Sequence, residues 1–267
     1  MRRAFLYLFV MLALQLFVSY AVHFIWFVVD GWSVIDALRL VKSPSPMTHT
    51  AEMTIAASVI SSVLTLVVFI WRKWCVMSPA YLRERQWGVF FWCVVAALGT
   101  ILPSVYLHSL FPWLPNLMED TFERVLANDY GYFAICLVAP FVEEVVFRGA
   151  ILRALLGHFS RHWVAIVVSA LMFSVAHFNP AQMPHAFIIA LLLGWMYYRT
   201  GSILPGVLFH WINNTVAYVM YKVFYFVDTD SLEGMFGNDD KAVVLALVFS
   251  LFLLVPALYQ LSWRMRK

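Results

Sequence analysis

The segment Tyr130–Leu156 reads YGYFAICLVAPFVEEVVFRGAILRALL, and it decides the fold class of this chain. Its length is enough to cross a bilayer, which takes about 20 predominantly apolar residues. Three charged residues, Glu143, Glu144 and Arg148, interrupt its apolar character near the middle. A charged side chain at the bilayer centre costs at least ~2.5 kcal/mol, and such residues usually mark a functional site. We therefore expect a membrane helix that carries a functional site.

The composition of the whole chain agrees with a membrane protein. Of its 267 residues, 63% are hydrophobic and 12% are charged, whereas soluble domains carry about 25% charged residues. The net charge of +3 is small and the basic residues are dispersed at helix ends, which argues against a nucleic-acid-binding surface. Cys75, Cys93 and Cys136 lack the paired spacing of a disulfide framework or a zinc site.

Hydropathy predicts an all-α, polytopic transmembrane bundle of about eight spans. We expect a single membrane domain over residues 1–267, with its core helices at about 131–220. The first apolar run is longer than the apolar part of a cleaved signal peptide, so we expect it to remain as a membrane helix. Residues 113–129 are expected at the membrane interface. The apolar runs lie at about 4–29, 52–71, 87–108, 131–157, 162–179, 183–198, 203–224 and 241–262.

The distribution of basic residues predicts the orientation of the chain. With an even number of spans, both termini lie on the same side of the membrane. That side would carry twelve Lys and Arg residues and the opposite side five, with Arg148 set aside as intramembrane. The positive-inside rule then places both termini in the cytoplasm of a multi-pass protein in the cell inner (cytoplasmic) membrane. The acidic segments 119–129 and 228–240 are expected to be loops on the outer side.

The first cluster of polar residues is EEVVFR, Glu143 to Arg148. Glu144 and Arg148 are four residues apart, so they share a helix face and can pair. Glu143 is displaced by about 100° around the helix and is expected to point elsewhere, into a cavity. An ion pair that only orders the bundle would need one glutamate, and this helix has two.

Two further apolar segments carry polar residues at helical spacing. In FSVAHF, His177 lies on the same face as Phe173, and in FHWINN, His210 and Asn214 share a face. A lone histidine such as His177 is more often a satisfied core or interfacial residue than a catalyst, and His210 with Asn214 is as consistent with hydrogen bonds between helices as with a functional site. Together with the two glutamates and the arginine, they provide what water-mediated hydrolysis requires. A carboxylate can take a proton, a histidine can help to activate water, and His and Asn can donate to an oxyanion.

Several other catalytic classes lack their sequence patterns here. The chain contains no H-E-x-x-H zinc motif, no G-x-S-x-G nucleophile elbow and no G-x-x-x-x-G-K-[ST] phosphate loop. No pair of intramembrane aspartates is present either, which argues against aspartyl protease chemistry.

The three polar segments fit the motifs of one known family. EEVVFR fits E-E-x-x-x-R, FSVAH fits F-x-x-x-H, and HWINN fits H-x-x-x-N within the stretch GSILPGVLFHWINN (201–214). Each motif is weak alone, but their order, spacing and placement on helices are specific in combination. Over about residues 131–220, the chain resembles the CAAX prenyl protease and bacteriocin-processing family, also called the Abi family.

This resemblance implies a glutamate-dependent intramembrane endopeptidase whose catalytic core is the segment 131–220. By the resemblance, Glu143 and His177 would activate the hydrolytic water. Glu144 and Arg148 would support and orient that pair. The partners would be the lipid bilayer and a peptide or membrane-associated protein as substrate, and the apolar helices indicate that this substrate is itself lipophilic or enters near the membrane.

The resemblance also implies an oxyanion site and leaves the role of metal open. His210 and Asn214 would stabilise the oxyanion. No cofactor is expected, although Zn²⁺ is possible because Glu and His can ligate it. In a zinc-dependent version of the same protease, the ligands would be Glu143, His177 and His210.

Two function classes other than proteolysis stay open on the sequence alone. One is a non-catalytic membrane protein that confers bacteriocin self-immunity or binds a partner. The other is a transporter or proton relay, since intramembrane Glu and His residues also serve such proteins. No inverted repeat relates the two halves of the chain, which disfavours many transporter folds. The sequence does not indicate the oligomeric state.

Overall fold

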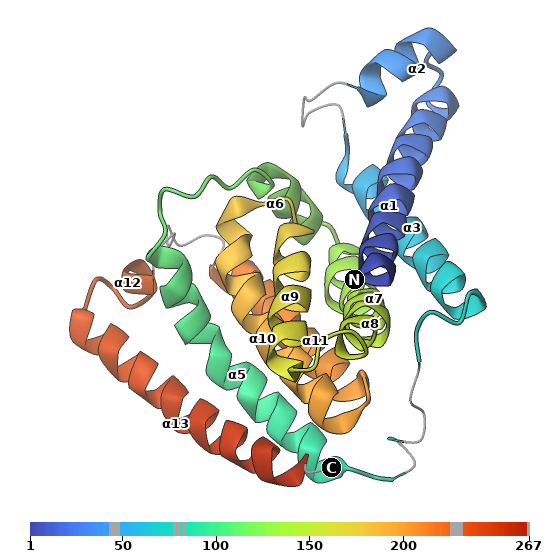
Figure 1. The fold of residues 1–267 in the computed structure, drawn as a ribbon. Helices are drawn as coiled ribbons and strands as arrows, with labels where there is room; N and C mark the ends of the chain where they lie inside the picture. Colours follow the sequence, from blue (N-terminus) through green and yellow to red (C-terminus); the bar gives the residue numbers. More distant parts are fainter. Residues whose placement is uncertain (43–48, 77–80, 82–83, 225–231, 266–267) are drawn as a thin grey trace.

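The computed structural model describes residues 1–42, 49–76, 81, 84–224 and 232–265, and these contain helices and no strand (Figure 1). The expected all-α class is therefore confirmed. The longer helices of the described chain are α1 (Arg2–Val29), α3 (Ala51–Trp71), α5 (Trp87–Ser109), α9 (His162–Val175), α10 (Met183–Thr200), α11 (Leu204–Phe224) and α13 (Asp240–Arg264). The shorter elements are α2 (Val34–Val41), α6 (Glu119–Ala127), the 3₁₀ turn η4 (Pro180–Gln182) and α12 (Leu232–Met235).

Four of the described helices are long and apolar enough to cross a membrane, namely α1, α3, α5 and α13. The shorter helix α9 is apolar as well. Two of the other expected spans, 131–157 and 203–224, carry polar motif residues, and the first of these is divided into shorter helical elements, whereas 183–198 forms the unbroken helix α10 with polar residues at both ends. Helix α11, for example, includes His210, Asn213 and Asn214, which lower its mean hydropathy. The expectation of about eight spans is thus met in part, and the remaining spans stay a prediction.

The outward faces of the terminal helices are strongly apolar. Phe9 and Phe17 on α1 are 68% and 72% exposed, and Phe249 and Phe252 on α13 are 74% and 71% exposed. Soluble monomers rarely expose large contiguous apolar surfaces, and such surfaces mark contact with a membrane or a partner. These faces therefore suit contact with lipid.

The segment 131–156 forms one continuous helical rod with two irregular turns. It consists of the π-helical turn η2 (Phe133–Val138), α7 (Ala139–Val146), the π-helical turn η3 (Phe147–Leu152) and α8 (Arg153–Leu156). We call this rod the central helix. Pro140 has no N–H to bond four residues back, which accounts for the irregular turn before it. At the second turn, the Ser169 hydroxyl of α9 donates to the Phe147 carbonyl at 3.4 Å.

The other helices surround the central helix (Figure 1). Helices α1 and α3 pack together on one side of it, and α5 and α13 form an antiparallel pair on the far side of the bundle. Helices α9, α10 and α11 fill the space between these two pairs. Phe147, Ile151 and Leu152 on the central helix are at most 2% exposed, which places this helix in the core of the bundle.

Two sequence expectations about local structure need correction. The run 162–179 was expected to be helical throughout, but α9 ends at Val175 and Phe178 has a φ of 52°. The reason is Pro180, which favours extended backbone in the residue before it; Asn179 has φ −125° and ψ 103°. The acidic segment 119–129 was expected to be a loop, but it forms the helix α6. The segment 228–240 is described only from residue 232 onward, where α12 begins.

We predict that Gly99→Ala destabilises the packing of α5 against α13. A Cβ at Gly99 would lie 2.8 Å from the backbone nitrogen of Leu254, so a helix backbone would have to shift. Overpacking of this kind costs about 1–3 kcal/mol. The measurement is thermal unfolding of the purified protein in detergent.

Gly88→Ala is the matched control on the same pair of helices. Its Cβ would meet the end of the flexible Arg264 side chain at 2.8 Å, which can move away. Both substitutions gain the same helix propensity over glycine, about 1 kcal/mol. An equal or smaller loss of stability for Gly99→Ala would contradict the prediction.

Candidate active site

A buried ion pair lies at the centre of the bundle. Arg148 donates from Nη1 to Oε1 of Glu144 at 2.7 Å, and their side chains are 2% and 0% exposed. The pairing expected from their spacing is therefore confirmed. The guanidinium also lies over the ring of Phe173 on α9, 4.6 Å from its centroid, and donates from Nη2 to the Ala190 carbonyl of α10 at 3.4 Å. One arginine thus connects the central helix to two neighbouring helices.

His210 of α11 lies between the two adjacent glutamates. Its Nδ1 is 3.2 Å from Oε1 of Glu144, and its Nε2 is 3.7 Å from Oε2 of Glu143. Because an ionised carboxylate only accepts hydrogen bonds, Nδ1 is the donor to Glu144. The distance from Nε2 to Glu143 is longer than a direct hydrogen bond. Nε2 is therefore the ring nitrogen left to interact with a bound molecule.

A glycine allows α11 to approach the buried carboxylate. A Cβ at Gly206 would lie 2.7 Å from Oε2 of Glu144. Gly206 and His210 are four residues apart and share a helix face. Close approach of the α11 backbone at Gly206 is thus what brings the His210 ring within reach of Glu144. Oε2 of Glu144 has no hydrogen-bond partner within the described part of the chain.

Four of the six predicted site residues line one cavity of about 520 Å³, namely Glu143, His177, His210 and Asn214. The Glu143 side chain is 28% exposed, so its carboxylate is accessible from this space. Glu144 and Arg148 are not among the lining residues. The expectation that Glu143 points into a cavity while its neighbour pairs with Arg148 is therefore confirmed.

His177 lies in the turn after α9, and its Nδ1 donates to the Phe173 carbonyl at 2.8 Å. This bond satisfies a free carbonyl at the helix end and orients the ring, whose centroid is 4.7 Å from that of Phe173. In the neutral ring Nε2 is then an acceptor. The histidine nitrogen that lies near the Glu143 carboxylate, at 3.7 Å, is Nε2 of His210 rather than a nitrogen of His177. The two residues expected to act on the same water thus share a cavity without a direct ion pair.

Asn214 connects α11 to the first irregular turn of the central helix. Its Nδ2 donates to the Ile135 carbonyl at 3.1 Å, and its Oδ1 accepts from Nδ2 of Asn213 at 3.5 Å. The Cys136 thiol donates to the Asn214 backbone carbonyl at 3.4 Å. An amide nitrogen carries two hydrogens, so Asn214 keeps one N–H for a molecule in the cavity.

Other polar residues, which lie outside the three motifs, are found in or beside the cavity. His185 lies in the first turn of α10, and Asn213 is buried with no hydrogen-bond partner for Oδ1 within the described residues. Asn179 donates from Nδ2 to Oδ1 of Asn116 at 2.8 Å and accepts from the Leu117 N–H at 3.0 Å, which holds the segment before α6 at this end of the cavity. A histidine at the start of an otherwise apolar helix was the available signal for His185.

The three residues that would be the ligands of a zinc-dependent protease, Glu143, His177 and His210, do not form a metal site in this structure. Among the described residues, no group of three His, Cys, Asp or Glu side chains is arranged to hold a metal ion. The two nitrogens of His210 face two different carboxylates, and Nδ1 of His177 is bonded to a carbonyl. The residues Glu143, His177 and His210 therefore do not fit a zinc ion as they are arranged.

Residues 129–216 match the protein family described as type II CAAX prenyl endopeptidase Rce1-like. The resemblance to the CAAX prenyl protease family is confirmed. The matched segment is about a third of the 267 residues, and it contains all three motifs from Glu143 to Asn214. Comparison with curated proteins and with solved structures gives no significant match. The family match indicates a protease, and together with the apolar helices it indicates a membrane protein.

We predict that Arg148→Ala strongly destabilises the fold, since it leaves Glu144 buried without its charged partner. Breaking a buried ion pair in this way costs about 3–5 kcal/mol. The matched control is Arg161→Ala, because Arg161 is exposed at the start of α9. Thermal unfolding in detergent measures both, and a loss no larger than that of the control would refute the structural role of the pair.

Gly206→Ala is expected to displace α11 from Glu144 and so to separate His210 from the carboxylate. The added methyl group cannot fit 2.7 Å from Oε2 without a shift of the backbone or of the ion pair. Gly157→Ala serves as control, because its Cβ would meet only ordinary contacts at 3.7 Å. Unfolding temperature and peptidase activity should both fall for Gly206→Ala alone.

Proposed function

We propose that this protein is an intramembrane endopeptidase of the glutamic type, which hydrolyses a peptide bond without a metal ion. The observation that carries the proposal is the shared cavity of Glu143, His177, His210 and Asn214, backed by the buried pair of Glu144 and Arg148. A carboxylate, two histidines and an amide around one cavity supply a base, a proton carrier and oxyanion donors.

In the proposed mechanism Glu143 is the general base. Its carboxylate is the charged acceptor of the cavity, and it takes a proton from a water molecule that attacks the peptide carbonyl carbon. The new C–O bond forms as the carbonyl π electrons move to oxygen. His177 presents Nε2 because the Phe173 carbonyl holds Nδ1, so it can receive this proton from Glu143 and deliver it to the nitrogen of the leaving amine. Collapse of the intermediate then breaks the C–N bond.

The oxyanion is stabilised by Nε2 of His210 and Nδ2 of Asn214. Since Nδ1 of His210 donates to Glu144, Nε2 can donate as well only when the ring is an imidazolium. The Glu144 carboxylate, which is itself held by Arg148, lies beside that positive charge and stabilises it. Glu144 and Arg148 are therefore positioning residues in this proposal, and they act through His210.

The proposed substrate is a peptide precursor, a leader peptide or a segment of a membrane-associated protein. The lining of the cavity combines the polar site residues with apolar ones such as Leu126 and Ile189, which suits a segment with a polar backbone and apolar side chains. The proposed location is the inner (cytoplasmic) membrane, with both termini in the cytoplasm, as the distribution of basic residues predicts.

The test is cleavage of a quenched fluorescent peptide library by the detergent-purified protein. Glu143→Gln should lower kcat at least about 100-fold, since general-base catalysis contributes 10²–10⁴-fold. Glu119→Gln is the matched control, because Glu119 is exposed at the start of α6. Both variants should unfold at the temperature of the unmodified protein.

Adding a chelator to each reaction distinguishes the metal-free mechanism from a zinc-dependent one. Cleavage that depends on Glu143 and is indifferent to chelator supports the proposed mechanism. Loss on chelation with rescue by Zn²⁺ would overturn the metal-free mechanism. Full activity of Glu143→Gln would overturn the assignment of the base. A self-immunity phenotype in cells that survives Glu143→Gln would favour the non-catalytic alternative.

A further inference from the structure

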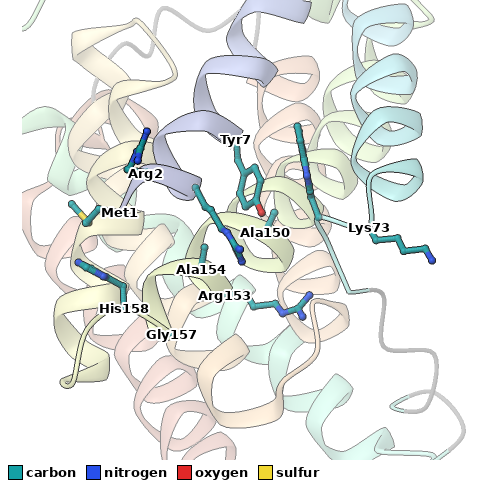
Figure 2. A pocket seen from close by; sticks show the side chains of 11 residues that line it. Met1, Arg2, Tyr7, Lys73, Ala150, Arg153, Ala154, Gly157 and His158 are labelled. Carbon is teal, nitrogen blue, oxygen red and sulfur yellow. The ribbon is translucent and has the colours of Figure 1, made fainter.

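A second cavity, of about 620 Å³, lies at the other end of the central helix (Figure 2). It is bounded by the first residues of α1, the chain just after α3, and the last turns of the central helix. It shares no lining residue with the candidate active site. Its lining is strongly basic, and the basic side chains are Arg2, Arg3, Lys73, Arg153 and His158.

Small residues on the central helix create the space for this cavity. Ala150, Ala154 and Gly157 are spaced by four and three residues, so they lie on one helix face. Their small size leaves space next to this face. The wall opposite is Tyr7 of α1, whose ring packs against Trp74 with centroids 4.9 Å apart. Figure 2 shows the Tyr7 hydroxyl pointing toward Ala150. The cavity is thus formed by side chains from three separate segments.

Within the described part of the chain, no acidic side chain forms an ion pair with the basic residues of this cavity. The ion pairs of the described residues involve Arg39, Arg148 and His210, and none includes a basic residue of the cavity. Arg199, which lies outside this cavity, has its hydrogen bonds satisfied by the protein, because its guanidinium donates to the carbonyls of Met265 and Ser262 at 2.9 and 2.7 Å. Like charges gathered in a concave site raise the local concentration of anions. The cavity is therefore suited to a ligand with more than one negatively charged oxygen.

An apolar groove continues from the basic cavity along α1. It is lined by Arg2, Arg3, Phe5, Leu6 and Phe9, so it shares both arginines with the basic cavity. Phe5, Leu6 and Phe9 are 55%, 48% and 68% exposed. A simple anion would use only the basic cavity. An amphipathic molecule with a phosphate head and hydrocarbon chains matches both parts.

We propose that this site binds an anionic phospholipid, with its phosphate among Arg2, Arg3, Lys73 and Arg153 and an acyl chain along Phe5, Leu6 and Phe9. The basic residues lie on the side that the charge distribution predicts to be cytoplasmic, where anionic lipids attract clusters of Lys and Arg. Binding of lipid here would join α1 to the central helix, which carries the candidate catalytic glutamate. The proposal does not depend on the proposed protease activity.

The test is native mass spectrometry of the purified protein titrated with phosphatidylglycerol or phosphatidylcholine of the same acyl chains. We expect phosphatidylglycerol to bind more tightly than phosphatidylcholine. Each basic residue near a membrane surface contributes about fivefold in affinity for anionic lipid. Lys73→Gln with Arg153→Gln should therefore weaken phosphatidylglycerol binding about thirtyfold.

The matched control removes two exposed charges outside the cavity, Arg161→Gln with Lys241→Gln, and should bind phosphatidylglycerol as the unmodified protein does. Equal binding of the two lipids, or equal loss in both double variants, would overturn the proposal. Unfolding temperatures in phosphatidylcholine micelles verify that all variants are folded.

A further arm separates a lipid from free phosphate as the source of the anion. Phe5→Ser with Phe9→Ser should weaken phosphatidylglycerol binding and leave the basic cavity unchanged. Inorganic phosphate at the same concentration should displace little bound lipid. If phosphate displaces the lipid fully and the phenylalanine substitutions have no effect, the site binds a free anion and the lipid assignment is wrong.

Discussion

The buried ion pair of Glu144 and Arg148 is the interaction on which the arrangement of this bundle depends. A carboxylate with 0% exposure is tolerated only if its charge is paired, and here Oε1 takes the bonds while Oε2 has no hydrogen-bond partner within the described residues. Arg148 provides the charge, and it extends to Phe173 of α9 and the Ala190 carbonyl of α10. His210 of α11 donates to the same carboxylate oxygen. Three helices are thus positioned around one charged group of the central helix.

The two adjacent glutamates therefore have different roles, since one positions the neighbouring helices and the other is accessible from the cavity. Glu143, one residue earlier, turns by about 100° and faces the cavity instead of the core. His210 lies between the two glutamates, so the ring that bonds the buried carboxylate also lies 3.7 Å from the accessible one. Close approach of α11 requires Gly206, in keeping with the preference of membrane helices for small residues where their backbones meet.

The central helix also organises the opposite end of the molecule. Toward the C-terminal end of the central helix, Ala150, Ala154 and Gly157 form a face of small residues. A basic cavity lies between this face and the start of α1. Charged groups in the core are paired, whereas those of this cavity are accessible and have no acidic partner within the described residues. The same helix therefore carries an ion-paired polar cluster inside the bundle and one wall of an anion-accepting surface at its end.

The sequence by itself determined the helical class, the approximate helix ranges and the pairing of Glu144 with Arg148, because helical periodicity is a local property. It also determined the family motifs. Only the tertiary structure decided which groups meet across helices: Glu143 approaches His210 rather than His177, and His185 enters the cavity. At the irregular turn that begins at Phe147, the Ser169 hydroxyl from another helix donates to the Phe147 carbonyl, a contact between distant segments. Contacts between distant segments depend on side-chain packing, which periodicity along one helix does not encode.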